Sequence, residues 1–184
     1  MPRYYRRRYR TIVRAPKKKW ATNIVTRTFT IDSQNPSPYI TMVTNAAQNN
    51  TPTPTILKCG NFKVNADFVL AYSQAPSVIP IIHVVAYILF LPEGILPTNN
   101  AQLGAVIGAH PEYIMAWKQL DADLDYSTTN PTNVGTQRVT FSSRLKRNLN
   151  SGDQVVFAVL NNTDGVGVTS IRVALTNQYW TCAN

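Results

Sequence analysis

The sequence predicts an all-β domain, a sandwich or a closed barrel, that follows a short basic arm. Two observations predict the β class: about eight segments alternate or are wholly apolar, and turns rich in Pro, Gly and Asn separate them. A third observation predicts the arm, because the positive charge lies in the first 20 residues. No strand–helix alternation occurs, so we expect no parallel sheet.

The length and composition suit one folded domain. The chain has 184 residues, of which 44% are hydrophobic and only 15% are charged. A domain of this size buries roughly 70% of the surface of its unfolded chain, so a substantial core can form and overall disorder is excluded. We assign residues 1–20 to a basic arm and residues 21–184 to a single β domain.

Eight segments have the pattern of strands. Phe62, Val64 and Phe68 recur at a spacing of two or four, which predicts a strand buried on one face. Residues 95–110 stay ambiguous, since they contain either a loop or one to two turns of helix. Residues 81–91 form a nearly continuous apolar stretch, which predicts a strand buried on both faces. The predicted strands are residues 23–31, 39–44, 61–71, 81–91, 113–120, 137–143, 154–160 and 168–178.

The net charge of +9 resides in the arm. Residues 1–20 hold nine bases and no acid, whereas residues 21–184 hold nine bases and nine acids, so the body sums to 9 − 9 = 0. The arm has no apolar period, and its like charges repel one another, so we expect it to be flexible unless bound. A neutral body on a polycationic arm separates polyanion binding from the fold.

Aromatic residues are interleaved with the bases of the arm. This combination suits single-stranded nucleic acid, because cations contact phosphates while rings stack on bases at about 1–3 kcal/mol each. The predicted nucleic-acid-binding residues are Arg3, Tyr4, Tyr5, Arg6, Arg7, Arg8, Tyr9, Arg10, Arg14, Lys17, Lys18, Lys19 and Trp20. Basic clusters also suit nuclear import, which is compatible with nucleic-acid contact. The predicted nuclear-localisation residues are Arg6, Arg7, Arg8, Lys17, Lys18 and Lys19.

The residues that catalysis requires are sparse. His83 lies within an apolar run, His110 precedes a proline, and no Gly-x-Ser-x-Gly, Walker or His-Glu-x-x-His pattern occurs. Cys59 and Cys182 have no metal-ligand spacing, and Cys59 is interpreted as a small apolar residue at the start of a strand. We therefore expect no enzyme, no cofactor and no metal centre.

Three aspartates recur two positions apart, at Asp121, Asp123 and Asp125, which raises the question of a calcium site. The EF-hand loop requires Gly at its sixth and Glu at its twelfth position, where this chain has Tyr126 and Thr132. A solvated acidic loop is favoured, and a divalent ion at a subunit contact stays open.

The sequence predicts no membrane insertion and no secretion. Residues 78–91 form the longest apolar run, about 14 residues against the roughly 20 that a spanning helix requires, and Pro80 and His83 interrupt it. The basic N-terminus lacks the apolar segment of a signal peptide, because Arg14 follows Ile12 and Val13 almost at once.

Short motifs along the chain resemble those of a known family. The segments are residues 1–10 (MPRYYRRRYR), 25–29 (VTRTF), 91–94 (LPEG), 110–115 (HPEYIM) and 144–153 (RLKRNLNSGD). Together they are similar to the capsid proteins of circoviruses and related small circular single-stranded DNA viruses. This chain is shorter than typical members, and its arm is about half as long.

The resemblance implies a single jelly roll of two four-stranded antiparallel sheets, of which sixty copies close into a T=1 icosahedral shell around single-stranded DNA. The implied partners are further copies of the chain, the DNA, import receptors and a host-cell receptor, and the implied locations are the virion and the host nucleus during assembly. A neutral body suits a protein that covers itself with copies, because interface cores are depleted in charge. The alternative is a non-viral nucleic-acid-binding protein of ribosomal or chromatin type, whose body would usually be basic too.

Overall fold

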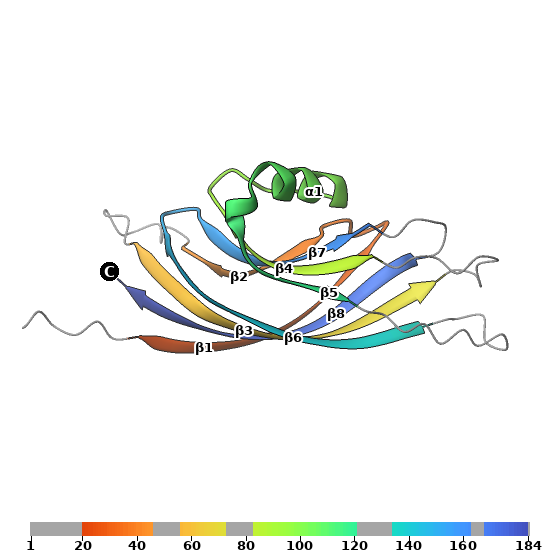
Figure 1. The fold of residues 1–184 in the computed structure, drawn as a ribbon, viewed down its shortest axis with the longest axis horizontal. Helices are drawn as coiled ribbons and strands as arrows, with labels where there is room; N and C mark the ends of the chain where they lie inside the picture. The colour runs from red at the N-terminus through yellow and green to blue at the C-terminus, as the bar shows by residue number, and fades with distance from the viewer. Residues whose placement is uncertain (1–19, 46–55, 73–82, 121–133, 163–167, 184) are drawn as a thin grey trace, which may run out of the picture.

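The computed structural model of the chain describes residues 20–45, 56–72, 83–120, 134–162 and 168–183, which form two four-stranded antiparallel sheets packed face to face (Figure 1). The long-strand sheet has the order β1-β8-β3-β6, and the helix-covered sheet has the order β2-β7-β4-β5. This is the strand order of a jelly roll, so the predicted all-β class and sandwich are confirmed. The strands are β1 (Ala21–Asp32), β2 (Tyr39–Thr44), β3 (Leu57–Tyr72), β4 (Val84–Leu91), β5 (Ile114–Leu120), β6 (Val134–Leu149), β7 (Gln154–Asn161) and β8 (Val168–Ala183).

All eight predicted strands are present, but five of them, β1, β3, β6, β7 and β8, are longer than predicted. In β3 the register shifts between Gly60 and Phe62, and Asn61 adopts a positive φ of 53°. This bulge breaks the alternation on which the prediction depended, while the strand continues on its far side back to Leu57. The sixth strand was predicted to end at residue 143, and residues 144–149 form the last part of β6 before the turn.

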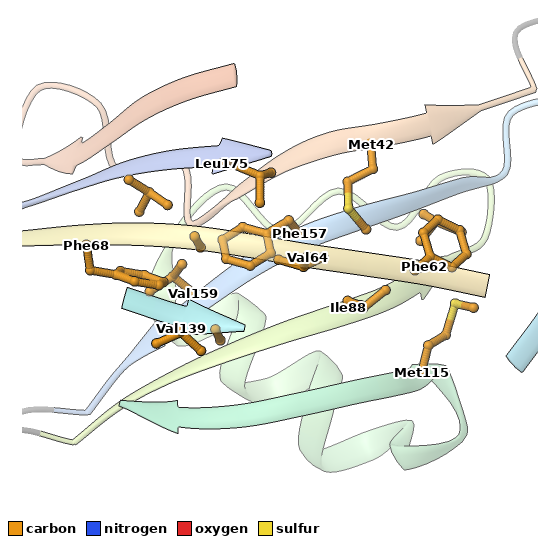
Figure 2. Close-up of a cluster of buried hydrophobic side chains, with 14 of the residues drawn as sticks. Met42, Phe62, Val64, Phe68, Ile88, Met115, Val139, Phe157, Val159 and Leu175 are labelled. Carbon is orange, nitrogen blue, oxygen red and sulfur yellow. The ribbon is translucent and has the colours of Figure 1, made fainter. Parts of the chain in front are cut away.

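The core fills the space between the two sheets, and Phe157 of β7 lies at its centre (Figure 2). The Phe157 ring is fully buried, and its centroid lies 6.2 Å from that of Phe29, 6.3 Å from that of Phe68 and 6.3 Å from that of Phe141. These three partners come from β1, β3 and β6, so one side chain of the helix-covered sheet contacts three strands of the long-strand sheet.

The helix-covered sheet is buried on both faces. Along β7, Val155, Phe157 and Val159 point into the sandwich core, while Val156 and Ala158 belong to a second apolar cluster on the opposite face. Helix α1 (Asn100–Ala109) and the 3₁₀ helix η1 (Pro111–Tyr113) lie over that opposite face (Figure 1). This double burial explains the continuous apolar sequences of β4 and β7.

Helix α1 resolves the ambiguous segment and is held at its first turn. The Asn99 side chain accepts a hydrogen bond from the backbone N–H of Gln102 at 2.9 Å, which caps the helix. The Asn100 side chain donates to the carbonyl of Asn161 at 2.6 Å and accepts from its N–H at 2.8 Å. Leu103 is fully buried in the second cluster. The helix start is therefore joined to the end of β7.

Two segments that carry the family resemblance meet in the fold. The turn after β4 contains Glu93, and the turn between β6 and β7 contains Gly152 and Asp153. The buried Asp153 carboxylate accepts hydrogen bonds from the N–H groups of Glu93 at 3.1 Å and Asn150 at 2.8 Å. Gly152 has a φ of 85°, and a Cβ there would lie 2.6 Å from the Glu93 side chain. The pairing of the two turns therefore requires glycine at this position.

Replacing Phe157 with alanine tests the central packing. We expect F157A to lower the free energy of unfolding by about 3–5 kcal/mol, because it removes a fully buried ring that touches three opposing strands. Urea unfolding followed by circular dichroism measures this change. The matched control is Leu96→Ala, whose side chain is 59% exposed and whose loss should change stability by less than about 0.5 kcal/mol. Equal effects of the two variants would contradict the packing described here.

Candidate nucleic-acid interface

Trp20 is the one predicted nucleic-acid-binding residue that lies within the described part of the chain. The other arm residues, Arg3 to Lys19, lie outside it, and so do the nuclear-localisation clusters. Asp121, Asp123 and Asp125 also lie outside the described residues. These assignments stay predictions, and the structure defines the surroundings of the point at which the arm joins the body.

The arm joins the body at the edge of the long-strand sheet. Trp20 directly precedes β1, whose first residue, Ala21, pairs with Thr181 of β8. The Trp20 residue is 39% exposed, so it lies outside the core but is partly covered by the protein surface. Because β1 is the edge strand of its sheet, any molecule held by the arm is brought to this edge.

Lys146 reaches Trp20 across the sheet. Its Nζ lies 5.4 Å from the centroid of the Trp20 ring, within the range of a cation–π contact. Lys146 is on β6 and Trp20 precedes β1, at opposite edges of the sheet and three strand spacings, or about 14 Å, apart. Both side chains must therefore lie along the sheet surface and extend toward each other.

Gly60 makes room for this arrangement. It pairs with both Lys146 and Trp180, so it occupies the middle of the register row that contains them. A Cβ on Gly60 would lie 2.7 Å from Lys146 Cγ and 3.1 Å from the carbonyl oxygen of Leu145. The missing side chain leaves a gap over which the Lys146 stem passes.

Trp180 adds a second aromatic side chain to the same surface. It pairs with Thr22 on β1 and with Gly60 on β3, and the Trp180 residue is 38% exposed. The neighbouring residue Tyr179 is buried and stacks on Phe62, with ring centroids 5.7 Å apart, which places Trp180 on the outward face. One end of this face thus carries Trp20, Trp180 and Lys146 together.

Within the described part of the chain no element lies over the outward face of the long-strand sheet, and this face is basic. The register places on this face the bases Lys58, Lys63, Arg138, Lys146 and Arg172 and the acids Asp32 and Asp67. The face therefore carries 5 − 2 = +3, although residues 21–184 as a whole sum to zero. The helix-covered sheet offers no comparable face, since α1 and η1 lie over it (Figure 1).

One base and one acid of this face pair with each other. Arg138 Nε donates to Asp67 Oδ1 at 2.6 Å, and its Nη2 donates to Oδ2 at 3.2 Å. The hydrogen bond from Arg138 holds the pKa of the Asp67 carboxyl below its usual value. Among the residues that the structure describes, no carboxylate lies within ion-pair distance of Lys58, Lys63 or Lys146. These ammonium groups are available to an external anion.

The remaining candidate reactive groups, Cys59 and His110, are held in packing contacts. Cys59 is fully buried, and burial raises the pKa of its thiol to about 12, so it is a thiol and not a thiolate at neutral pH. His110 follows the last turn of α1, and its ring stacks on Tyr113 with centroids 4.7 Å apart. Across the described ranges, no three His, Cys, Asp or Glu side chains gather as metal ligands.

A search of the helices in the described residues finds none long and apolar enough to span a membrane. Comparison of the chain with protein-family models and with curated proteins gives no match. Fold and surface chemistry therefore carry the functional argument.

Sequence reasoning found Trp20 but missed the residues that surround it. Lys63 is predicted to point outward by the alternation of β3, yet its neighbours across the sheet depend on the register. Trp180 lies beyond the predicted end of the last strand, and Lys146 lies beyond the predicted end of the sixth. Because the bulge at Asn61 interrupts the alternation, the sequence did not predict that Gly60 faces outward beside Lys146.

A substitution at Gly60 tests this arrangement. We expect Gly60→Ala to lower the free energy of unfolding by about 1–3 kcal/mol, because the new Cβ overlaps Lys146 and approaches the β6 backbone. The control is Gly108→Ala, which has open space around its Cβ position in α1 and should gain about 0.5–1 kcal/mol. Urea unfolding midpoints at unchanged m-value measure both. A neutral Gly60→Ala would show that Lys146 does not lie over this position.

Proposed function

We propose that this chain is a viral coat protein that assembles into a closed T=1 shell and packages single-stranded DNA through its arm. One observation carries the proposal: a jelly roll leaves one sheet face open, and that face is basic and aromatic at the end where a nine-cation arm begins. The motifs that resemble circovirus capsid proteins support the same function.

The body has surfaces that suit contacts between copies. Trp117 on the edge strand β5 is 61% exposed, and Leu96 in the segment after β4 is 59% exposed. Exposed aromatic and aliphatic side chains of this kind mark protein–protein contacts when they lie on one surface. Both belong to the part of the molecule that contains the helix-covered sheet, away from the basic face. We propose that the copies touch one another through such surfaces.

The proposal also orients the subunit in the shell. The arm root and the basic face lie on the same sheet, so both would point toward the packaged DNA. The Asp67–Arg138 pair and the neighbouring threonines would then line the inside of the shell. In a eukaryotic host the clusters Arg6–Arg8 and Lys17–Lys19 would direct the newly made chain to the nucleus before assembly.

Assembly is the first property to measure. We expect the purified full chain to sediment as one large, uniform species and to show closed shells of constant diameter by negative-stain microscopy. A chain that stays monomeric at high concentration and moderate salt would overturn the coat function. That result would instead favour the alternative, a non-viral nucleic-acid-binding protein with a basic tail.

Deletion of residues 1–19 tests the role of the arm. Nine cations on a single strand set a limiting slope of log K against log salt of roughly −6, from about −0.7 per phosphate neutralised. We expect the deletion to remove most of this slope in a filter-binding or anisotropy titration with oligothymidylate. Circular dichroism should show the β-sheet signal of the full chain in the same sample. An unchanged slope would contradict arm-mediated packaging.

A further inference from the structure

The outward face of the long-strand sheet contains a hollow close to Trp180. It has a volume of about 460 Å³, and its lining includes Ile24, Lys63, Asn65, Thr140 and Gln178. These residues come from all four strands of the sheet. The hollow therefore belongs to the rigid paired region and not to a loop.

The hollow and Trp180 lie in adjacent register rows. Trp180 pairs with Thr22 and Gly60, and the next outward row joins Ile24, Gln178 and Lys63. Alternate residues of a strand are about 7 Å apart, so Trp180 stands one side-chain spacing from the hollow. Aromatic surface, a cation and polar groups thus follow one another along β8 and β3.

We propose that this hollow binds one segment of single-stranded nucleic acid, with a base stacked against Trp180 and a phosphate between Lys63 and Lys146. The inference deepens the proposed function and rests on it for the identity of the nucleic acid, because it gives the packaged strand a second site on the body. The body then contributes to packaging beyond the charge of the arm.

The chemistry of the face fits a nucleotide. A base needs a flat apolar surface, which the 38%-exposed Trp180 offers, and its phosphate needs a cation without a carboxylate partner. Lys63 and Lys146 meet that requirement among the described residues. Asn65 and Thr140, joined by a 3.0 Å hydrogen bond, add amide and hydroxyl groups that can contact bases of any sequence.

Charge argues against a second copy of the chain as the occupant. The face carries five bases and two acids, one of which is already paired, so two copies facing each other would bring like charges together. A polyanion is the complementary partner. The arm also begins at this face, so a strand bound by the arm is held at high effective concentration over the hollow.

Photocrosslinking to the full chain tests the site directly. The probe is oligothymidylate with single 5-iodouracil substitutions, irradiated with the unmodified chain, and the crosslinked peptides are identified by mass spectrometry. We expect a crosslink at Trp180. Crosslinks confined to Trp117 or to residues 1–19 would overturn the inference. The readout does not depend on shells: a crosslink at Trp180 without particle formation would retain this site and reject the coat function.

Substitutions then measure the contribution of the ring. We expect Trp180→Leu to weaken oligothymidylate binding by about 5- to 100-fold with an unchanged salt slope, and Trp180→Phe to restore most of the affinity. Lys63→Gln should reduce the slope by about 0.7. The control Lys118→Gln, which replaces an exposed lysine on the other sheet, should leave both unchanged. If Trp180→Leu prevents assembly but not DNA binding, the face is a subunit contact and the inference is wrong.

Discussion

The structure depends on the packing of Phe157 between the two sheets. A side chain that touches aromatic rings from β1, β3 and β6 fixes how far apart the sheets lie and which residues of each sheet face inward. Because side chains alternate along a strand, the inward position of Phe157 directs Val156 and Ala158 to the opposite face. That face is apolar and needs a cover, which α1 and η1 provide.

The position of α1 and η1 determines which sheet face is accessible to other molecules. Helix α1 lies over the helix-covered sheet, and no described element lies over the outward face of the long-strand sheet, whose rows hold threonines, amides and three of the four lysines in the described residues. A chain whose body is neutral on average thus has a local surplus of positive charge. The surplus lies on the same sheet as Trp20, the residue at which the arm joins the body.

The sequence predicted the parts of the fold that depend on side-chain alternation. Phe62, Val64 and Phe68 are all fully buried, as their spacing indicated, and the continuous apolar run of β4 is buried on both faces. The sequence did not predict the full length of β3, because the bulge at Asn61 reverses the alternation of buried and exposed residues within the strand. The helix was ambiguous because its anchor, Asn100 on Asn161, joins residues far apart in the chain.

The candidate site was predictable only in its basic and aromatic composition. Trp20 stood out because it ends a run of bases, but nothing in the order of residues relates it to Lys146. Their contact follows from the register of four strands and from the absence of a side chain at Gly60. A pattern read along one strand cannot supply such a relation, since neighbours across a sheet come from distant segments.

The antiparallel pairing of β1 also determines how the junction between the arm and the body resists force. The arm joins β1 at Ala21, so a force applied at this junction along the axis of β1 would load the pairing of β1 with β8. The hydrogen bonds of an antiparallel ladder are perpendicular to the strands, and a pull along the axis loads them together in shear. With β1 paired to β8 from Ala21 through Asp32, the load spreads over the whole strand and does not open one pair at a time. The junction between the arm and the sandwich is therefore held by the full length of β1.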